Sequence, residues 1–308
     1  MTTALAPAAP PTAPQARPRW ESRARRREAG TAWRFLLPAV IFFVALFFVP
    51  ILNQLVAAAN GGVDGTTFVG LDNFVTAFND PEVIHSFTIT LIYAAGSVTI
   101  GIGIGILLAV ILNQALPGRT LFRSLLLIPY LTSVAIIGLL WRNILDPQIG
   151  ILNRLLETVG LPGQTWLSTA PLATIIGITI WSSAGYTMVL FLAGLQGIPG
   201  MYYEAAQIDG AGPWRRFFSI TLPLLAPTTL FVSVIGVIGA LQQFALPYIV
   251  TGGGPGNATS LYAHRVFIVA FNDNQFGYAS ALSVLLLIVI LILSIIQLKV
   301  GDRANDHT

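Results

Sequence analysis

The 308-residue sequence contains no cysteine and a single lysine, and only 9% of its residues are charged. A soluble domain usually has about 25% charged residues, so water is not the main solvent of this chain. The missing cysteines exclude disulfides and thiolate chemistry. Lys299 has no glycine-rich turn of the GxxxxGK type beside it, which excludes ATP hydrolysis by a phosphate-binding loop. The three histidines, His85, His264 and His307, are too far apart in the sequence to support a metal cluster or a histidine-activated nucleophile.

Long uncharged intervals separate the few charges. Hydrophobic residues make up 55% of the chain, and its mean hydropathy is +0.75. About 20 apolar residues in a helix cross the hydrocarbon layer of a bilayer, and six of the intervals are long enough. The sequence therefore predicts an all-α membrane protein with six transmembrane helices near residues 34–58, 88–113, 121–143, 171–195, 220–243 and 277–298. We expect a disordered tail over residues 1–32, one membrane domain over 33–300 and a second tail over 301–308.

The basic residues predict which side of the membrane each loop faces. With six spans both termini lie on one side, and 13 of the 16 basic residues fall on that side. The other side carries Arg142, Arg154 and Arg265 together with most of the acidic residues. By the positive-inside rule, we expect a multi-pass protein of the cell membrane with both termini in the cytoplasm.

Two local patterns predict how helices pack. Leu71, Phe74, Val75 and Phe78 have helical spacing in the external segment after the first span, which favours a short interfacial helix. In the second predicted span, Gly101 and Gly105 form a small-xxx-small pair, which favours close helix packing.

The interiors of the predicted spans contain no Asp, Glu or Lys. Carriers driven by protons or sodium often keep such residues in spite of their insertion cost, because the coupling ion needs a binding charge. Their absence weakens the interpretation as a secondary carrier, although backbone carbonyls can also bind sodium.

The stretch YYEAAQIDGAGPWRRFFSITLPLL, residues 202–225, is polar in an otherwise apolar chain. It predicts two short helices joined by a corner. Tyr202 to Asp209 can form two helical turns with Glu204 in the first turn, where the helix dipole favours an acid. Gly210 permits the turn, and Pro213 suits the first position of the next helix. We call residues 199–219 the elbow, and we expect it at the cytoplasmic surface.

The spacing of this stretch resembles the EAA signature of binding-protein-dependent ABC importer permeases. Glu204-Ala205-Ala206 is followed after three residues by Gly210, and after nine more by Ile220, with Leu222-Pro223 one residue beyond. In that family the elbow is a coupling helix that docks into a separate ATPase subunit. The resemblance implies a coupling role for Glu204, Ala205, Ala206, Asp209, Gly210, Ile220, Leu222 and Pro223. The alternative is an amphipathic interfacial loop that matches the spacing by accident.

Three further stretches narrow the resemblance. FRSLLLIPY at 122–130, FLAGLQGIP at 191–199 and TGGGPGNAT at 251–259 resemble the sugar-importer permeases related to the maltose and glycerol-3-phosphate systems. The resemblance implies the type I permease fold of ABC importers, with a second permease subunit, two ATPase subunits and an extracytoplasmic solute-binding protein as partners. It also implies that this chain is not an enzyme and binds no cofactor or metal, because ATP and magnesium are held by the ATPase subunits. Taken alone, the GGGP sequence is equally typical of a flexible surface turn.

Polar residues inside two predicted spans are the candidates for contact with a sugar, since amides and hydroxyls pair with sugar hydroxyls and aromatic rings stack on sugar rings. The alternative for each is a hydrogen bond or packing contact between helices. The candidates are Trp181, Ser182, Ser183, Gly185 and Tyr186 in the fourth span, and Gln242 and Gln243 at the end of the fifth.

Three other functions remain compatible with the sequence. The chain could be an ABC permease for a solute other than a sugar. A facilitator or secondary carrier would transport without an ATPase partner, and a membrane-embedded sensor or scaffold would bind partners and transport nothing. The sequence does not name the sugar, and it does not distinguish a free sugar from glycerol phosphate or a phosphodiester.

Overall fold

The computed structural model describes residues 32–61 and 67–305. The chain divides into two compact units, residues 1–53 and 54–308, and each is considered by itself. The described part of the first unit belongs to a helix over Ala32–Ala58, which contains the π-helical turn η1 (Val44–Phe48) and α2 (Val49–Ala58). This helix is long and apolar enough to be the first predicted span. Apart from Ala32, the predicted N-terminal tail lies outside the described residues.

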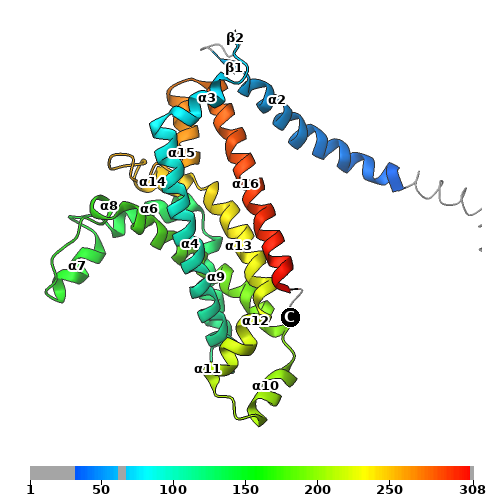
Figure 1. The fold of residues 1–308 in the computed structure, drawn as a ribbon. Helices are drawn as coiled ribbons and strands as arrows, with labels where there is room; N and C mark the ends of the chain where they lie inside the picture. The colour runs from blue at the N-terminus through cyan, green and yellow to red at the C-terminus, as the bar shows by residue number, and fades with distance from the viewer. Residues whose placement is uncertain (1–31, 62–66, 306–308) are drawn as a thin grey trace, which may run out of the picture. The chain divides into compact units, whose positions relative to one another are not determined.

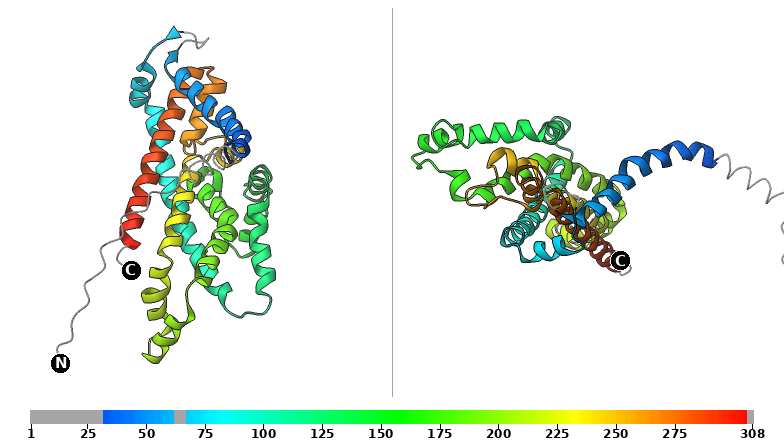
Figure 2. Two further views of the ribbon diagram at one scale, coloured as in Figure 1. Left: turned by 90° about the vertical axis from the view of Figure 1, so that its right-hand side faces the viewer. Right: turned by 90° about the horizontal axis from the view of Figure 1, so that it is seen from above.

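Four helices form the body of the second unit and lie side by side in Figures 1 and 2. They are α4 (Pro81–Asn113), α9 (Pro171–Gln196), α13 (Ala226–Leu241) and α16 (Phe276–Asn305). Helix α4 packs against α9 and α13, and α13 packs against α16. Three of the four, α4, α9 and α16, are long enough to cross a membrane unaided. The last helix continues to Asn305, so it extends past residue 300, where the sequence predicted the C-terminal tail to begin.

Helix α4 has a well-defined start. The Asp80 carboxylate accepts hydrogen bonds from the backbone N–H groups of Glu82 at 2.9 Å and Val83 at 3.4 Å, and Pro81 occupies the first helical position. These are the two devices that satisfy or avoid unpaired N–H groups at a helix N-terminus. The helix therefore begins at Pro81, seven residues before the predicted span.

The contact between α4 and α9 depends on glycine. A Cβ atom at Gly105 would collide with the Thr187 side chain of α9, so the two backbones lie as close as a missing side chain allows. This confirms the close packing predicted at Gly105. Gly101 is also buried, but a Cβ atom there would meet no atom within 4 Å, because this position faces a cavity.

Two apolar clusters form the core along these helices. The first joins α4, α9 and the loops beyond them around Tyr93, Ile175 and Leu246. The second lies nearer the other end, around Met188, Phe191 and Leu225. Because lipid is as apolar as these side chains, the clusters stabilise the body by close packing more than by exclusion of water.

The third predicted span, 121–143, is not a straight helix. It consists of α5 (Arg119–Leu131) and α6 (Val134–Ile144), which meet at an angle of 97°. Thr132 and Ser133 have extended ψ angles of 142° and 135°, which ends the helix. The Thr132 hydroxyl donates to the Ile128 carbonyl at 2.8 Å, and Pro129 has no N–H to donate to the preceding turn. The helix therefore ends at the polar residues Thr132 and Ser133, where the apolar pattern alone predicted continuity.

The fifth predicted span, 220–243, is also bent. Helical turns over Pro213–Leu224 meet α13 at 62°, with Leu225 at the bend. They comprise α11 (Pro213–Arg216), the π-helical turn η2 (Phe217–Thr221) and α12 (Leu222–Leu224). Pro227 cannot donate a hydrogen bond to the carbonyl four residues earlier, that of Pro223, and the bend lies between these two prolines. The described chain thus has four unbroken candidate spans, or six if each bent pair crosses once.

Short elements connect the long helices. The predicted interfacial helix is present as α3 (Asp72–Asn79), where Phe74 packs inward and Leu71, Val75 and Phe78 are exposed. It follows a hairpin in which Asn60 pairs with Phe68 and Gly61 with Thr67. The remaining short elements are β1 (Asn60–Gly61), β2 (Thr67–Phe68), α7 (Ile151–Thr158), α8 (Trp166–Thr169), α14 (Ala245–Val250), α15 (Tyr262–Phe267) and the π-helical turn η3 (Ile268–Asn272).

Helix α15 ties the start of α4 to α16. The Arg265 guanidinium lies 2.7 Å from the Glu82 carboxylate and 3.9 Å from that of Asp80. The Tyr278 hydroxyl of α16 donates to Asp80 at 2.9 Å, and the backbone N–H of Tyr262 donates to the Thr90 hydroxyl at 2.7 Å. These contacts place Arg265 and the two acids at the same end of the body, as their predicted assignment to one side of the membrane requires.

The glycine contact gives the first prediction. We expect Gly105→Val to destabilise the second unit by about 1–3 kcal/mol, because the added side chain overpacks the α4–α9 contact. The matched control is Gly103→Val, two residues away on the same helix, where a Cβ atom meets nothing within 4 Å. Thermal unfolding of the two purified variants measures the difference, and equal melting temperatures would contradict the prediction.

Candidate functional site

The elbow follows α9, contains α10 and α11, and lies at the lower end of the second unit in Figure 1. Its first arm is α10 (Gly200–Ile208). The helix begins two residues before the predicted start, so Glu204 lies in its second turn, and the prediction of Glu204 in the first turn is wrong. Pro199 has an extended backbone and supplies the N-cap, which sets the start at Gly200.

The corner after α10 is a Schellman motif. Gly210 has a φ angle of 73°, in the left-handed region that favours glycine. The N–H of Gly210 donates to the Gln207 carbonyl at 3.0 Å, and the N–H of Ala211 donates to the Ala206 carbonyl at 2.8 Å. These two bonds satisfy carbonyls that the end of the helix leaves unpaired. The corner therefore has a defined geometry, with Pro213 at the first position of α11 as predicted.

The elbow presents polar and small residues away from the body. Glu204, Ala205, Asp209 and Gly210 are exposed, whereas Ala206 is half-buried. Ile208, an apolar residue on this surface, is 88% exposed.

The remaining residues of the spacing pattern directly follow the elbow. Ile220 lies in η2 and is half-buried, while Leu222 and Pro223 lie in α12 and are exposed. They precede the 62° bend, so they lie on the helical segment Pro213–Leu224 that begins in the elbow and not in the straight part of the fifth span.

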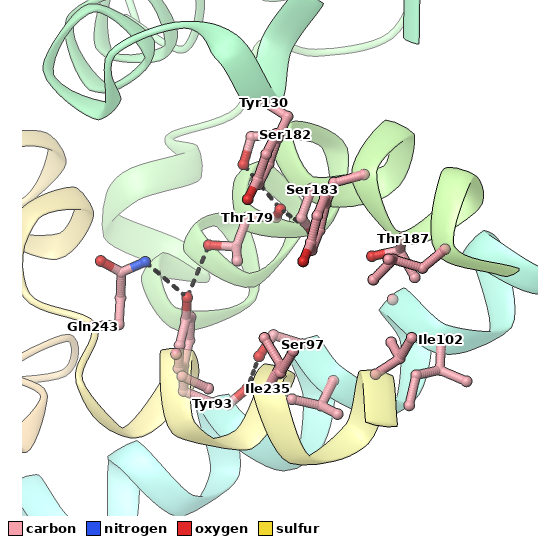
Figure 3. A pocket seen from close by; sticks show the side chains of 18 residues that line it. Tyr93, Ser97, Ile102, Tyr130, Thr179, Ser182, Ser183, Thr187, Ile235 and Gln243 are labelled. Atoms are coloured by element: carbon pink, nitrogen blue, oxygen red, sulfur yellow. Dashed lines mark hydrogen bonds between the residues drawn. The ribbon is translucent and has the colours of Figure 1, made fainter. Parts of the chain in front are cut away.

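A cavity of about 340 Å³ lies between α4, α5, α9 and α13 (Figure 3). Hydroxyl groups, one amide and two stacked tyrosine rings line its polar side, and none of the described lining residues is charged. The rings of Tyr130 and Tyr186 are parallel to within 6° and their centroids are 4.4 Å apart. The polar lining residues are Tyr93, Ser97, Tyr130, Thr179, Ser182, Ser183, Tyr186, Thr187 and Gln243.

A hydrogen-bonded cluster closes one end of the cavity. The Tyr93 hydroxyl lies 2.9 Å from the Thr179 hydroxyl and accepts a bond from the Gln243 amide at 3.4 Å (Figure 3). A second cavity of about 120 Å³ shares Tyr130, Thr179, Ser182 and Gln243 with the first. These four side chains therefore line both cavities and lie between them.

The structure brings some of the predicted solute contacts together and separates others. Ser182, Ser183, Tyr186 and Gln243 line the main cavity. Trp181 lies outside it, 43% exposed, with its ring edge-to-face against that of Trp141 at 5.4 Å.

Gln242 and Gly185 also lie away from the main cavity. The Gln242 side chain lines a different groove, between α15 and α16. A Cβ atom at Gly185 would collide with the Leu126 carbonyl of α5, so this glycine allows the close approach of two backbones. The geometry of Gly185 therefore supports a role in helix packing, the alternative to solute contact.

A model of the family described as "Binding-protein-dependent transport system inner membrane component" matches residues 101–305 of this chain. The chain belongs to this family. The permease is 36% identical over 283 residues to the "Probable ABC transporter permease protein YurN" of Bacillus subtilis, which covers 89% of this chain and 96% of the relative. It is 33% identical over 291 residues to the trehalose/maltose transport system permease protein MalF of Thermococcus litoralis, covering 92% and 98%. It is also 33% identical over 279 residues to the sn-glycerol-3-phosphate transport system permease protein UgpA of Brucella abortus, covering 89% and 95%.

Solved structures agree with the fold. A chain in the crystal structure of a bacterial alginate ABC transporter, in complex with a periplasmic protein that holds an alginate pentasaccharide, superimposes with a TM-score of 0.78. The two chains are 24% identical, and the match covers 91% of the permease and 95% of the other chain. The type I permease fold of ABC importers, predicted from the EAA spacing, is confirmed. As a permease subunit, the chain is not an enzyme.

Sequence reasoning missed several polar residues of the cavity, and a signal for them was present. Tyr93, Ser97 and Gly101 are spaced four residues apart, so they share one face of α4, and all three line the cavity. A row of polar and small residues inside an apolar span is a pattern that predicts a lined space. Tyr130 and Thr179 gave no comparable signal, because their position depends on the break in α5 and on the partners they meet.

Part of the TGGGPGNAT loop is anchored in the body, at Gly253 and Thr259, while Gly252 and residues 255–257 are exposed. Thr259 is fully buried, and its hydroxyl lies 2.6 Å from the Thr251 hydroxyl and 3.0 Å from the Gly254 carbonyl. A Cβ atom at Gly253 would overlap the ring of His264, which is buried and lies 3.2 Å from the Ser260 hydroxyl. Burial lowers the pKa of His264, so its ring is neutral at physiological pH. The glycines thus allow this loop to pack against a neutral histidine.

The Schellman corner gives the second prediction. We expect Gly210→Ala to destabilise the end of α10 by about 1–2 kcal/mol, because alanine resists a left-handed backbone. Hydrogen exchange of the α10 amides measures this local stability and should become faster.

Gly212→Ala is the matched control for Gly210→Ala. Gly212 lies two residues further on, has a φ angle of −69°, and has no atom within 4 Å of its Cβ position. If both substitutions accelerate exchange equally, the corner does not depend on the left-handed glycine.

Proposed function

We propose that this permease forms the solute path of an ATP-driven importer of a sugar or sugar-like solute, together with a second permease subunit. In this proposal two copies of an ATPase subunit bind the cytoplasmic side, and an extracytoplasmic solute-binding protein delivers the solute. ATP and magnesium are held by the ATPase subunits. The observation that carries the proposal is the exposed elbow, whose Glu204 and Asp209 are exposed at α10, which three residues separate from the end of the cavity-lining helix α9.

The lining of the cavity supports a neutral solute with many hydroxyl groups. Besides the stacked pair of tyrosines, six hydroxyl-bearing side chains and the Gln243 amide can donate or accept hydrogen bonds, and the tyrosine rings offer a flat surface for a sugar ring. Relatives of the permease are named for trehalose and maltose and for glycerol-3-phosphate. A phosphate group is usually met by arginine or lysine, and the described lining residues include neither, which favours an uncharged sugar.

The distribution of charge supports the proposed orientation. The elbow carries Arg215 and Arg216, and the opposite end of the body carries the Asp80–Glu82–Arg265 cluster. With the positive-inside rule, the elbow and both termini face the cytoplasm. The cluster and the hairpin β1–β2 then face the side on which a binding protein arrives.

One experiment tests the assembly. Purification of the permease from its native membrane should bring down a second permease and an ATPase, and reconstituted vesicles should import solute only with ATP and binding protein. A facilitator or secondary carrier would transport without the ATPase. A sensor or scaffold would bind partners and transport nothing. An ABC permease for another class of solute would import that solute and leave sugars outside.

Charge reversal at the elbow gives the third prediction. We expect Glu204→Arg to abolish co-purification of the ATPase and ATP-dependent uptake, because the acid lies exposed at the proposed contact. The control is Glu157→Arg, an exposed glutamate on α7 away from the elbow. Normal uptake by the Glu204 variant, at wild-type amounts in the membrane, would refute the coupling role.

Two neighbouring glutamines give the fourth prediction. We expect Gln243→Ala to raise the KM for the solute about three- to tenfold, the effect of losing one or two hydrogen bonds in the cavity. Gln242→Ala provides the matched control, because the adjacent amide lines a different groove. Uptake measured over a range of solute concentrations distinguishes them, and equal KM values for the two variants would remove Gln243 from the solute path.

A further inference from the structure

The elbow has few contacts through which it can move the body. Helix α10 contains no buried residue, and only Tyr203 and Ala206, on one face of the helix, are half-buried. A helix that is almost wholly exposed transmits force poorly by apolar packing. Contacts of the side chains on its inner face with the body are therefore the candidates for coupling the movement of α10 to that of the membrane helices.

Tyr203 makes the one side-chain hydrogen bond that, among the described residues, joins α10 to the helical segment leading into the fifth span. Its hydroxyl lies 3.0 Å from the Thr221 hydroxyl of η2. Thr221 is only 6% exposed, and its own hydroxyl donates to the Arg216 carbonyl at 3.5 Å, which leaves it to accept from Tyr203. The bond thus connects an exposed helix to a buried point in the body.

The π-helical turn places Thr221 in this position. In η2 the backbone takes one more residue per hydrogen-bonded turn than in an α-helix, which rotates the residues that follow. Phe217, the first residue of the turn, packs against the apolar cluster that contains Met188, Phe191 and Leu225. The turn is therefore anchored at one end by packing and connected to α10 at the other by the hydroxyl pair.

The space around the bond is not filled by apolar side chains. A cavity of about 350 Å³ adjoins it, lined by Tyr203, Thr221 and Arg216 and by Asn113 and Gln114 at the end of α4. The Tyr203–Thr221 hydrogen bond therefore links α10 to η2 at the wall of this cavity.

We propose that the Tyr203–Thr221 hydrogen bond is a coupling strut, which makes η2 and the bent fifth span move with α10 when the ATPase displaces the elbow. The inference rests on the proposed function and adds to it a pair of positioning residues that lie outside the exposed docking surface. Glu204 receives the displacement in this scheme, and Tyr203, one residue earlier on the inner face, passes it on.

The test uses the complete transporter, with its ATPase, second permease and binding protein, in lipid vesicles. Tyr203→Phe and Thr221→Val each remove one hydroxyl and keep the shape of the side chain. We expect each to lower the amount of solute imported per ATP hydrolysed about two- to tenfold. This is the fold-change that corresponds to the net free energy of one hydrogen bond. The double variant should lose no more than the larger single loss, because both changes break the same bond.

Tyr202→Phe is the matched control. Tyr202 is the neighbouring residue on α10, is 48% exposed, and makes no side-chain hydrogen bond within the described chain. Its variant should import as much solute per ATP as the wild type. An unchanged ratio in Tyr203→Phe, or a double variant whose loss is the product of the single losses, would overturn the strut.

A distance measured between α10 and α4 distinguishes the loss of the hydrogen bond from a general loss of folding. The cysteine-free chain allows spin labels at Gln207→Cys on α10 and Ile111→Cys on α4, both exposed. In the assembled transporter the distribution of distances should broaden with Tyr203→Phe and stay narrow with Tyr202→Phe. An unchanged distribution would contradict the strut.

The failures of the two proposals are distinguishable. If wild-type vesicles import nothing with ATP and binding protein, the proposed function fails and the strut with it. If the wild type imports, Glu204→Arg does not, and Tyr203→Phe imports at the wild-type ratio, the proposed function stands and the strut alone is refuted.

Discussion

A helix in hydrocarbon has no water to pair with the backbone groups that a break exposes, and this constraint determines where the permease can bend. At each of its two bends a side chain or apolar packing compensates for the break. At the first, the Thr132 hydroxyl donates to a carbonyl of the preceding turn. At the second, Leu225 is fully buried in the apolar cluster around Met188 and Phe191. The breaks are therefore tolerated where side chains or packing replace the missing solvent.

The bends create the two functional features. The break after α5 lets its backbone approach α9 at Gly185 and brings Tyr130 against Tyr186 at the cavity. The bend before α13 turns the helical segment Pro213–Leu224 out of line with α13. Helix α9 connects the two, because it carries Thr179 to Thr187 along the cavity and ends at Gln196, just before the elbow. Helix α9 therefore lines the cavity along part of its length and leads directly into the elbow at its C-terminal end.

The sequence was sufficient to predict features that depend on local or periodic patterns. Uncharged intervals predicted the number of apolar segments, and the properties of glycine and proline predicted the corner at Gly210 and the start of α11 at Pro213. Features that depend on tertiary contacts were not predictable in this way. Trp181 and Gln242 looked as suitable for a solute as Ser183 and Gln243, and only the direction in which each side chain leaves the folded backbone separates them. Similarly, Gly101 and Gly105 form one motif in the sequence, yet one faces a cavity and the other a helix.

The uncharged lining of the cavity has an energetic consequence. A membrane potential acts on each elementary charge with about 2.3 kcal/mol per 100 mV. None of the described lining residues carries a charge, so the passage of the neutral sugar proposed above would move no net charge across the membrane. In that case the voltage of the cell would neither assist nor oppose uptake, and accumulation against a gradient would draw its free energy from the nucleotide alone.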